Sequence, residues 1–360
     1  MKVLVVSKTI TNSGDFLYAE YTKKFLEFHF SEIEFVYDDA FHEYVEEELL
    51  EYNAIIVSGG PLYDNRLMTY KYYPFMKFAF DNNIPVAFLG CGVYGKTGID
   101  EDVYSYQFSA ETLEIMNRIS YNGFLGCRDY ISEQILRNNG LSNTVITGCP
   151  TWYDMEWIDK PCRKVKKPQK IMISDPGVTK KKSDQRSKAK QACDLVEWMK
   201  KQYPYAEIVF SFNNGILTKY SAECNLLVKQ FLDENQIKWI NMERDSSKFH
   251  EYDNADLHVG FRVHSHLYCM AHRIPTILIE EDRRGYGMSD ILGLRHIFAY
   301  DIKREGEDKF YPNPVLLQRI RDEISQLYKS DMLDLSMAYE RMKFYKDVFK
   351  EALEHFFYNE

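Results

Sequence analysis

The stretch HVGFRVHSHLYCMAHRIPTILIEEDRRGYG, residues 258–287, concentrates side chains that can exchange protons or bind anions. It contains His258, His264, His266 and His272 together with four arginines, although the whole chain has 9 histidines and a net charge of -9. Histidine titrates near neutral pH, and arginine can hold a carboxylate or a phosphate through two parallel hydrogen bonds. A metal site, a cationic pocket for an anion and chance are the three explanations to weigh.

The local pattern favours the cationic pocket. DLHVGF is typical of a strand, and the apolar spacing after Arg262 predicts a helix that begins near His264. Arg262 and His264 are therefore expected at a strand end and a helix N-terminus, where the helix dipole attracts an anion. Arg283 or Arg284, after the next expected strand, would reach the same edge. His264 could then donate or accept a proton.

The histidine spacing does not suit a metal. His264 and His266 are two positions apart, which points them to different sides of a helix, and no HExxH pattern is present. His258 lies inside the expected strand and His272 lies two turns further along the helix. We therefore expect no metal site, and we expect His258 and His272 to be structural.

Other polar loops follow expected strands in both halves of the chain. In open α/β sheets, ligands bind at the carboxyl ends of the strands, so these loops are candidates for ligand binding. Each residue alone could equally be a helix cap or a turn residue. The candidates are Asn12, Gly14 and Asp15 in TNSGD, Gly59 and Gly60 in SGGPLYDN, Arg128 and Asp129 in CRDY, Ser174 in SDPG, and Asn213 in SFNNG.

Known nucleotide-binding fingerprints are weak or missing. GCGVYG, residues 90–95, has the GxGxxG spacing, but it follows a late strand and lacks the acidic residue of a dinucleotide site. The sequence contains no GxSxG. A nicotinamide enzyme is therefore only weakly supported.

Short apolar runs alternate with helical patterns through most of the chain, which predicts βα units and parallel sheets. We predict two tandem, doubly wound, Rossmann-like domains with a cleft between them. Their predicted bounds are 1–160 and 171–330, with a basic, proline-containing linker at 161–170 and a C-terminal helix at 331–360. The helix would cap the core, cross back to the first domain or form a dimer contact.

Composition excludes several classes of protein. The net charge of -9 argues against a nucleic-acid partner. The 7 cysteines are widely spaced and odd in number, which favours free thiols in a reducing compartment. The apolar run at the N-terminus is too short for a secretory signal, and no apolar run in the sequence approaches the length of a membrane span. We therefore expect a cytoplasmic protein.

Several motifs, in the right order over residues 1–295, resemble the polysaccharide pyruvyl transferase family. They are NSGD after the first strand, VSGGPLYD, TGCPTW, FRVHSHLYCMAHRIPTILIEEDRR, and CRDYISEQILRNNG, with Arg128, Asp129, Ser132, Leu136 and Gly140 at the matching places. The chain departs from the family pattern at Phe16, His266 and Arg273-Ile274. These departures bear on the identity of the acceptor more than on the type of reaction.

The resemblance implies a GT-B-like fold and transfer of a pyruvyl group from phosphoenolpyruvate to two hydroxyls of a sugar, which makes a cyclic ketal. It implies no cofactor beyond this donor, and an acceptor in a polysaccharide or its lipid-linked precursor. We expect the first domain to bind the acceptor and the second to bind the donor. His264 would be the acid, Arg262 and Arg128 the anion ligands with Arg284 in support, and Asp15 or Asp129 the acceptor's partner. Asn12, Gly14, Gly59, Gly60, Ser174, Asn213 and His266 would contribute further substrate contacts.

Two other functions remain open. A nucleotide-sugar-dependent glycosyltransferase of the same fold could use Glu280, Glu281 or Asp282 for the ribose, because fold alone does not decide function. A sugar- or peptide-binding scaffold without catalysis is the second. The basic segment 160–190 is either a solvated linker or a contact for the inner face of an anionic membrane. Self-association into a homo-oligomer is also left open.

Overall fold

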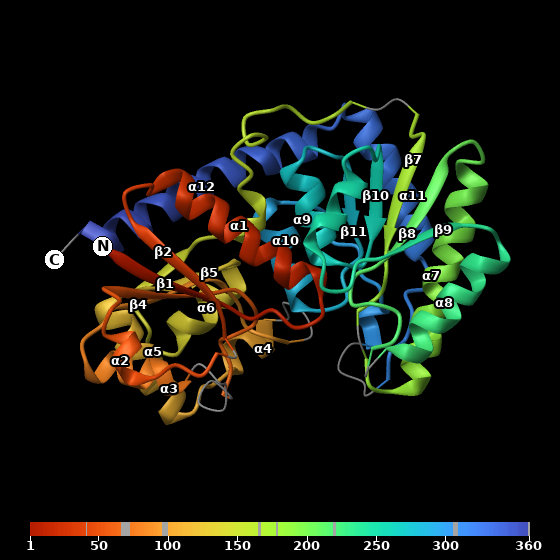
Figure 1. The fold of residues 1–360 in the computed structure, drawn as a ribbon. Helices are drawn as coiled ribbons and strands as arrows, with labels where there is room; N and C mark the ends of the chain where they lie inside the picture. Colours follow the sequence, from red (N-terminus) through yellow and green to blue (C-terminus); the bar gives the residue numbers. More distant parts are fainter. Residues whose placement is uncertain are drawn as a thin grey trace. The chain divides into compact units, whose positions relative to one another are not determined.

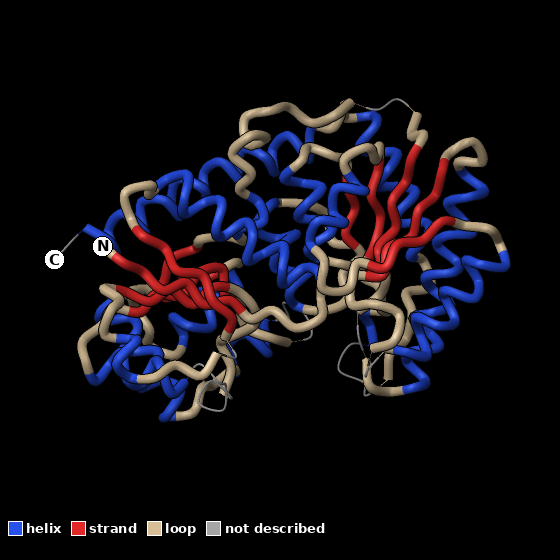
Figure 2. Tube along the Cα trace, in the orientation of Figure 1, coloured by secondary structure: helices blue, strands red, loops and turns tan. Residues whose placement is uncertain are grey.

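Two parallel β-sheets, each with its own helices, organise the chain (Figures 1 and 2). The structure is a computed structural model that describes residues 1–40, 42–65, 73–95, 100–164, 167–177, 179–218, 221–304 and 309–358. The expected linker 161–170 includes residues 165 and 166, which lie outside the described residues.

The first sheet has six parallel strands in the order β2-β1-β3-β4-β5-β6. Its central strands are apolar runs such as AIIVS, and every residue of β3 and β4 is buried, as expected for a parallel sheet covered on both faces. The strands are β1 (Lys2–Ser7), β2 (Glu34–Asp39), β3 (Ala54–Ser58), β4 (Val86–Cys91), β5 (Leu125–Cys127) and β6 (Thr144–Ile146).

Helices connect these strands in the alternating pattern that the sequence predicts. They are α1 (Ser13–His29), α2 (Glu46–Leu49), α3 (Tyr73–Asp81), α4 (Asp100–Ser105), α5 (Ala110–Asn122) and α6 (Tyr130–Asn138), followed by the short 3₁₀ turn η2 (Pro150–Trp152). Strand order reverses between β1 and β3, so the loops after these two strands flank the switch point where ligands bind in such sheets.

The second sheet has five parallel strands in the order β11-β10-β7-β8-β9. They are β7 (Lys170–Ser174), β8 (Glu207–Phe212), β9 (Lys238–Asn241), β10 (Leu257–Gly260) and β11 (Thr276–Leu278). The helices are α7 (Lys182–Gln202), α8 (Ala222–Glu234), α9 (Val263–Ala271), α10 (Arg283–Leu292) and α11 (Leu316–Lys329), with 3₁₀ turns η3 (Ser246–Tyr252) and η4 (Ile302–Arg304). The switch point of this sheet lies between β7 and β10.

The last helix, α12 (Leu333–Tyr358), contributes to both halves of the chain. One compact unit contains Met1–Ile10, Leu17–Met155 and Glu340–Glu360, and the other contains Thr11–Phe16 and Glu156–Tyr339. In the first unit, Phe349 of α12 stacks on Phe25 of α1 with ring centroids 4.4 Å apart. The C-terminal helix thus crosses back to the first unit, one of the three roles that its apolar stripe allowed.

One feature of the units differs from what the sequence alone indicates. The segment Thr11–Phe16, which contains NSGD, packs with the second unit although it follows the first strand. All seven cysteines are free thiols, as the sequence predicts, and all except Cys193 are buried.

Candidate functional site

The switch point of the second sheet brings together an arginine and a carboxylate that are far apart in the sequence. Ser174, the last residue of β7, lies opposite Gly260, the last residue of β10. Asp175 and Arg262 follow these two ends, so both side chains leave the sheet at its carboxyl edge. This is the place where the topology predicts ligand binding.

Asp175 and Arg262 form a two-point ion pair. Nε of Arg262 donates to Oδ1 of Asp175 at 2.7 Å, and Nη2 donates to Oδ2 at 2.6 Å. The Asp175 side chain is fully buried and that of Arg262 is 12% exposed. Burial disfavours the charged guanidinium, but the adjacent carboxylate outweighs it and raises the pKa of Arg262 above its ordinary value. The arginine is therefore charged and held in one orientation.

Asp175 also fixes the loop after β8. Its Oδ1 accepts a hydrogen bond from the backbone N–H of Asn213 at 3.0 Å, and the amide of Asn213 donates to Oγ of Ser265 at 2.9 Å. Asn213 is 1% exposed. Its contacts are thus with the protein, so the structure gives it a positioning role instead of the expected substrate contact.

His264 occupies the first turn of α9 and is partly exposed. Arg262 is the N-cap residue of this helix, and its own side chain makes no capping hydrogen bond. The N–H groups of a first helical turn carry partial positive charge, which favours an anion beside His264. The sequence placed Arg262 and His264 at this strand end and helix start, and the structure brings them together there.

The NSGD loop packs against the same region of the second unit. The backbone N–H of Ser13 donates to the carbonyl of Asn213 at 3.0 Å, and the amide of Asn12 donates to Oδ1 of Asp15 at 3.1 Å. A Cβ at Gly14 would overlap Nδ1 of His264, so only glycine permits this approach. Asn12, Gly14 and Asp15 therefore lie beside His264, where a ligand of His264 would meet them.

A chain of buried hydrogen bonds runs beneath α9 from Ser174. Oγ of Ser174 accepts the backbone N–H of Arg262 at 3.2 Å and lies 3.0 Å from Nε2 of His258. Nδ1 of His258 lies 2.8 Å from Oγ1 of Thr276, and the same oxygen lies 2.9 Å from Nδ1 of His266. Gly260 makes room for the Ser174 hydroxyl, because a Cβ there would overlap it. This series of hydrogen bonds fixes the backbone of Arg262 through Ser174.

Burial keeps His258 and His266, the two histidines in this series of hydrogen bonds, neutral. It lowers the pKa of His258 well below its ordinary value, with a smaller contribution from His266, and it lowers the pKa of His266 to about 3. Ser174 and His266 have no exposed surface. The expected substrate contacts of these two residues are therefore replaced in the structure by contacts to Arg262 and Thr276. The expectation that His258 is structural agrees with its position.

Two further ion pairs follow β11. Arg284 donates to the carboxylate of Asp282 through Nε at 3.0 Å and Nη2 at 2.6 Å, and its side chain is 39% exposed. Nζ of Lys188 lies 2.7 Å from Oε1 of Glu281, and both side chains are about nine-tenths buried, at 10% and 9% exposed. The backbone N–H of Gly177 donates to the same carboxylate.

The first unit contains a second arginine directly after a strand. Nε of Arg128 donates to Oδ2 of Asp129 at 3.1 Å, while Oδ1 of Asp129 caps α6 by accepting from Ser132 N–H at 2.7 Å. Asp129 is fully buried with both oxygens engaged, which favours a positioning role over contact with an acceptor. Nη2 of Arg128 is buried and has no hydrogen-bond partner among the described residues. A buried donor left in this way is a site for an acceptor atom of a ligand.

Glycines shape the edge around Arg128. A Cβ at Gly92 would overlap the guanidinium of Arg128. Gly59 and Gly60, which follow β3 at the switch point, have φ of 82° and 83°, values that favour glycine. The carbonyl of Gly60 accepts from Gly92 N–H at 3.1 Å, so the Gly-Gly loop supports the loop that faces Arg128.

Asp175 and Lys188 were not identified from the sequence. Asp175 stands directly after β7 in the loop SDPG, and that position was the available signal. Its partner Arg262 is 87 residues away, so the pairing required the strand order. Lys188 lies inside α7, where a lysine is usually solvated, and no sequence signal separates it from its neighbours.

Other kinds of site are not found in the described part of the chain. No group of three or more His, Cys, Asp or Glu side chains there is arranged to hold a metal ion. Within the same residues, no helix combines the length and the apolar character needed to span a bilayer.

Comparison with known families gives one match. The model of the polysaccharide pyruvyl transferase family matches residues 12–283, from the NSGD loop to the start of α10. No curated protein sequence matches the chain.

Solved structures share the fold at low sequence identity. The MnaA–UDP complex of S. aureus is 11% identical with a TM-score of 0.59, and covers 98% of this chain and 96% of its own. The UDP-GlcNAc 2-epimerase of Neisseria meningitidis bound to UDP-GlcNAc is 12% identical with a TM-score of 0.57, over 98% and 100%. The lipopolysaccharide outer core galactosyltransferase WaaB is 11% identical with a TM-score of 0.50, over 99% of each chain. These similarities confirm the expected GT-B-like fold and, at such identity, the fold alone.

Proposed function

Because the chain belongs to the polysaccharide pyruvyl transferase family, we propose that it moves the pyruvyl group of phosphoenolpyruvate onto two hydroxyls of a sugar and forms a cyclic ketal. The family is a family of transferases of polysaccharide biosynthesis. The donor, the ketal product and the residue roles below are our proposal.

The observation that carries the proposal is the placement of Arg262 beside the first turn of α9. Phosphoenolpyruvate has a carboxylate and a phosphate, and therefore needs fixed cations. Arg262 is held by Asp175 through Nε and Nη2, which leaves the Nη1 side of the guanidinium for a ligand. The N–H groups at the start of α9 add positive charge, and His264 is partly exposed at the same place.

His264 is the proposed general acid. It delivers a proton to the methylene carbon of phosphoenolpyruvate, which becomes a methyl group and leaves C2 positively charged. One acceptor hydroxyl bonds to C2 and loses its proton, phosphate leaves with the electrons of its C–O bond, and the second hydroxyl closes the ring and releases its proton. Asp15, which already accepts a hydrogen bond from Asn12, is the proposed partner of the acceptor hydroxyls.

Two parts of the proposal concern the other cations. Arg128, with its unpartnered Nη2, is proposed as a ligand for one of the anionic groups of phosphoenolpyruvate. Arg284 is a weaker candidate, because its exposed side chain already pairs with Asp282. The assignment of acceptor binding to the first unit and donor binding to the second stays a prediction.

The direct test is product analysis. The purified protein is incubated with phosphoenolpyruvate and candidate sugars, and mass spectrometry is used to look for a pyruvate ketal adduct while released phosphate is measured. Adduct and phosphate in equal amounts, both lost in His264→Ala, are the expected result. Phosphate release without an adduct, or no reaction with any saccharide acceptor, would contradict the proposal.

The competing glycosyltransferase function needs an open carboxylate for a ribose. Glu280 has no exposed surface and contacts Nδ1 of His296 at 3.1 Å through both oxygens, and Glu281 and Asp282 pair with Lys188 and Arg284. All three carboxylates are therefore already engaged. A thermal-shift assay separates the functions, since a ligand of the native state raises the unfolding midpoint. Stabilisation by a nucleoside diphosphate sugar and not by phosphoenolpyruvate would favour the competitor.

We infer further that the protein acts in the cytoplasm, at the inner face of the membrane where lipid-linked acceptors would be found. Lys160 and Arg163 both lie over the ring of Trp157, 3.8 Å and 5.0 Å from its centroid, in the basic segment. Such a cationic and aromatic cluster suits an anionic surface. Binding to phosphatidylserine vesicles, lost in Lys160→Glu/Arg163→Glu, tests this contact. Self-association stays a prediction for sedimentation analysis.

A further inference from the structure

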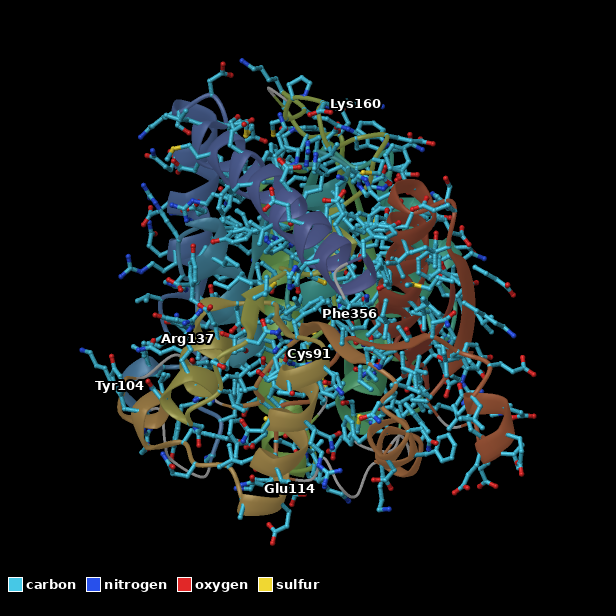
Figure 3. All side chains as sticks on the ribbon, turned by 90° about the vertical axis from the view of Figure 1, so that its left-hand side faces the viewer. Cys91, Tyr104, Glu114, Arg137, Lys160 and Phe356 are labelled. Carbon is cyan, nitrogen blue, oxygen red and sulfur yellow. The ribbon has the colours of Figure 1, made fainter. Side chains whose placement is uncertain are left out.

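Two neighbouring hollows lie on the first unit, on the surface of α3, α5 and α12. One has a volume of about 740 Å³ and the other about 550 Å³. Both are lined by Asn83, Tyr121 and Asn122, so they form one continuous surface, which we call the asparagine groove. Glu114 of α5, which lines the first hollow, and Phe356 of α12, which lines the second, are labelled in Figure 3. Its size is in the range of a ligand site.

The groove is separate from the candidate site of this unit. Asn83 comes just before β4, Asn122 just before β5, and Asn143 just before β6. These residues therefore mark the amino ends of the strands. Arg128 and the Gly-Gly loop lie at the carboxyl ends of the same sheet. The groove and the arginine are thus at opposite edges, and a ligand in the groove would not reach Arg128 directly.

Several amides in the groove are available to a ligand. Asn83, Asn117 and Asn122 are exposed, and within the described residues their side chains make no hydrogen bond. Asn143 differs, because its amide donates to the carbonyl of Ser120 at 3.2 Å and to that of Gly123 at 2.5 Å. Each available amide offers two donors and an acceptor, which matches the hydroxyl groups of a sugar.

An aromatic ring stands where the two hollows meet. Tyr121 is 89% exposed, and it makes no ring contact within the described part of the chain. Phe80 and Leu113 add partly buried apolar surface beside it. A flat exposed ring next to hydrogen-bonding groups suits a ligand with one apolar face and a polar edge, which is the character of a pyranose.

The charges of the groove are balanced. Arg118 contacts Glu114 at 3.0 Å and Asp81 at 3.8 Å, so its charge is already compensated by carboxylates. A nucleotide or another strongly anionic ligand would meet no uncompensated cation among these residues. The groove therefore favours a neutral ligand.

We propose that the asparagine groove binds a neutral stretch of a carbohydrate chain as a second saccharide site of the protein. The inference rests on the family's polysaccharide acceptor, and it would let a long chain be retained on the first unit while its reacting end is elsewhere. Tyr121 provides the stacking surface, and Asn83, Asn117 and Asn122 bind the hydroxyls.

The test is saturation-transfer NMR with neutral hexasaccharides of glucose, galactose and mannose, with a hyaluronan hexasaccharide as the anionic comparison. We expect binding of at least one neutral chain, and weaker binding of hyaluronan. Tyr121→Ala should weaken the neutral binding about tenfold, because one stacking contact is lost. Asn117→Ala should weaken it by a smaller factor. Pyruvyl transfer to a monosaccharide acceptor should be unchanged in both variants.

Tyr104→Ala is the matched control, because Tyr104 is a tyrosine of α4 that is 60% exposed and does not line the groove. It should bind the hexasaccharides like the wild type. Lack of binding by the wild type at millimolar concentration, or equal binding by the Tyr121 and Tyr104 variants, would overturn the inference. So would a dimer in sedimentation analysis that Tyr121→Ala disrupts, since the groove would then be a contact between copies.

The same measurements in His264→Ala, without phosphoenolpyruvate, separate this inference from the proposed function. Retained binding together with absent ketal formation by the wild type would reject only the proposed function. Active transfer together with no groove binding would reject only this inference.

Discussion

The carboxyl edge of each sheet carries an arginine paired with an aspartate, but the two arginines differ in how many hydrogen bonds the protein gives them. In each, an arginine comes within two residues of a strand end and is oriented by a fully buried aspartate, Arg128 by Asp129 and Arg262 by Asp175. Arg262 makes two hydrogen bonds to its aspartate, whereas Arg128 makes one and has an unpartnered Nη2. The aspartate of the second unit belongs to another loop, and that of the first is the next residue.

This difference indicates a division of work. Arg262 and His264 are held ready by the protein itself, so the second unit has the features of a chemical site. The buried Nη2 donor of Arg128 has no partner among the described residues, so we expect the first unit to provide a binding contact. The following substitutions would break or sharpen that comparison, beginning with the largest expected effect.

The largest effect is expected from His264→Ala. Loss of a positioned general acid should lower kcat about a hundredfold to ten-thousandfold, with little change in the KM for phosphoenolpyruvate. Steady-state phosphate release measures both. His250→Ala, which removes a histidine whose side chain is 69% exposed, is the control. Near-normal turnover of His264→Ala would remove this residue from the mechanism and leave the second unit without its proposed acid.

Asp175→Asn should destabilise the protein strongly, because it leaves the guanidinium of Arg262 buried without its counter-charge. Breaking a buried ion pair typically costs about 3–5 kcal/mol of the free energy of unfolding. Asp282→Asn, at the more exposed pair with Arg284, should cost about 0–1 kcal/mol. Urea unfolding of the two variants gives both values. Equal losses would show that burial does not distinguish these two pairs.

Acid should weaken the second unit through its buried histidines. Burial lowers the pKa of His266 to about 3, so the unfolded chain binds more protons than the folded one below about pH 6.5, the ordinary pKa of histidine. This residue's contribution to stability is therefore present at neutral pH and is lost as the pH falls from about 6.5 toward 3. Between pH 7 and 5 the loss is about 2 kcal/mol.

His266→Leu removes that proton uptake. The free energy of unfolding of this variant, measured with urea at pH 7 and pH 5, should fall by about 2 kcal/mol less than that of the wild type. His42→Leu, at a histidine whose side chain is 47% exposed, should keep the wild-type difference. Unchanged acid sensitivity in His266→Leu would mean that His266 is not held neutral.

The smallest effects are expected when a methyl group is added beside each site by changing a glycine to alanine. Gly14→Ala pushes on the His264 imidazole and should lower kcat, whereas Gly92→Ala pushes on the Arg128 guanidinium and should raise the KM for phosphoenolpyruvate. Misplacement of this kind should cost about tenfold or more in each parameter. Steady-state kinetics of the two variants separate an effect on proton transfer from an effect on binding. A lower kcat in both variants would contradict the proposal that the second unit performs the chemistry and the first unit only binds.

Much of the fold could be predicted from local patterns. DLHVGF predicts the strand that is found as Leu257–Gly260, and the helix expected to begin near His264 starts at Val263. Such buried parallel strands and amphipathic helices are strong signals because period and length agree. The strand-end positions of Arg128, Arg262 and His264 followed directly from these elements.

The features that could not be predicted from the sequence are those that depend on contacts between residues far apart in the chain. The partner of Arg262 required the knowledge that β7 and β10 are adjacent, since the chain between them is long. The burial of His266 depends on the packing of α9 over Thr276, because helical spacing alone did not show which side faces the core. The packing of Thr11–Phe16 with the second unit likewise comes from contacts to residues 213 and 244.

The contribution of Thr11–Phe16 to the second unit has a practical meaning for protein engineering. Chimeras between relatives are commonly joined at the apparent domain border, here near residue 156. Such a junction would give His264 a foreign peptide in place of its own Gly14. Grafts that are meant to exchange acceptor preference should therefore move the first sixteen residues together with the C-terminal half.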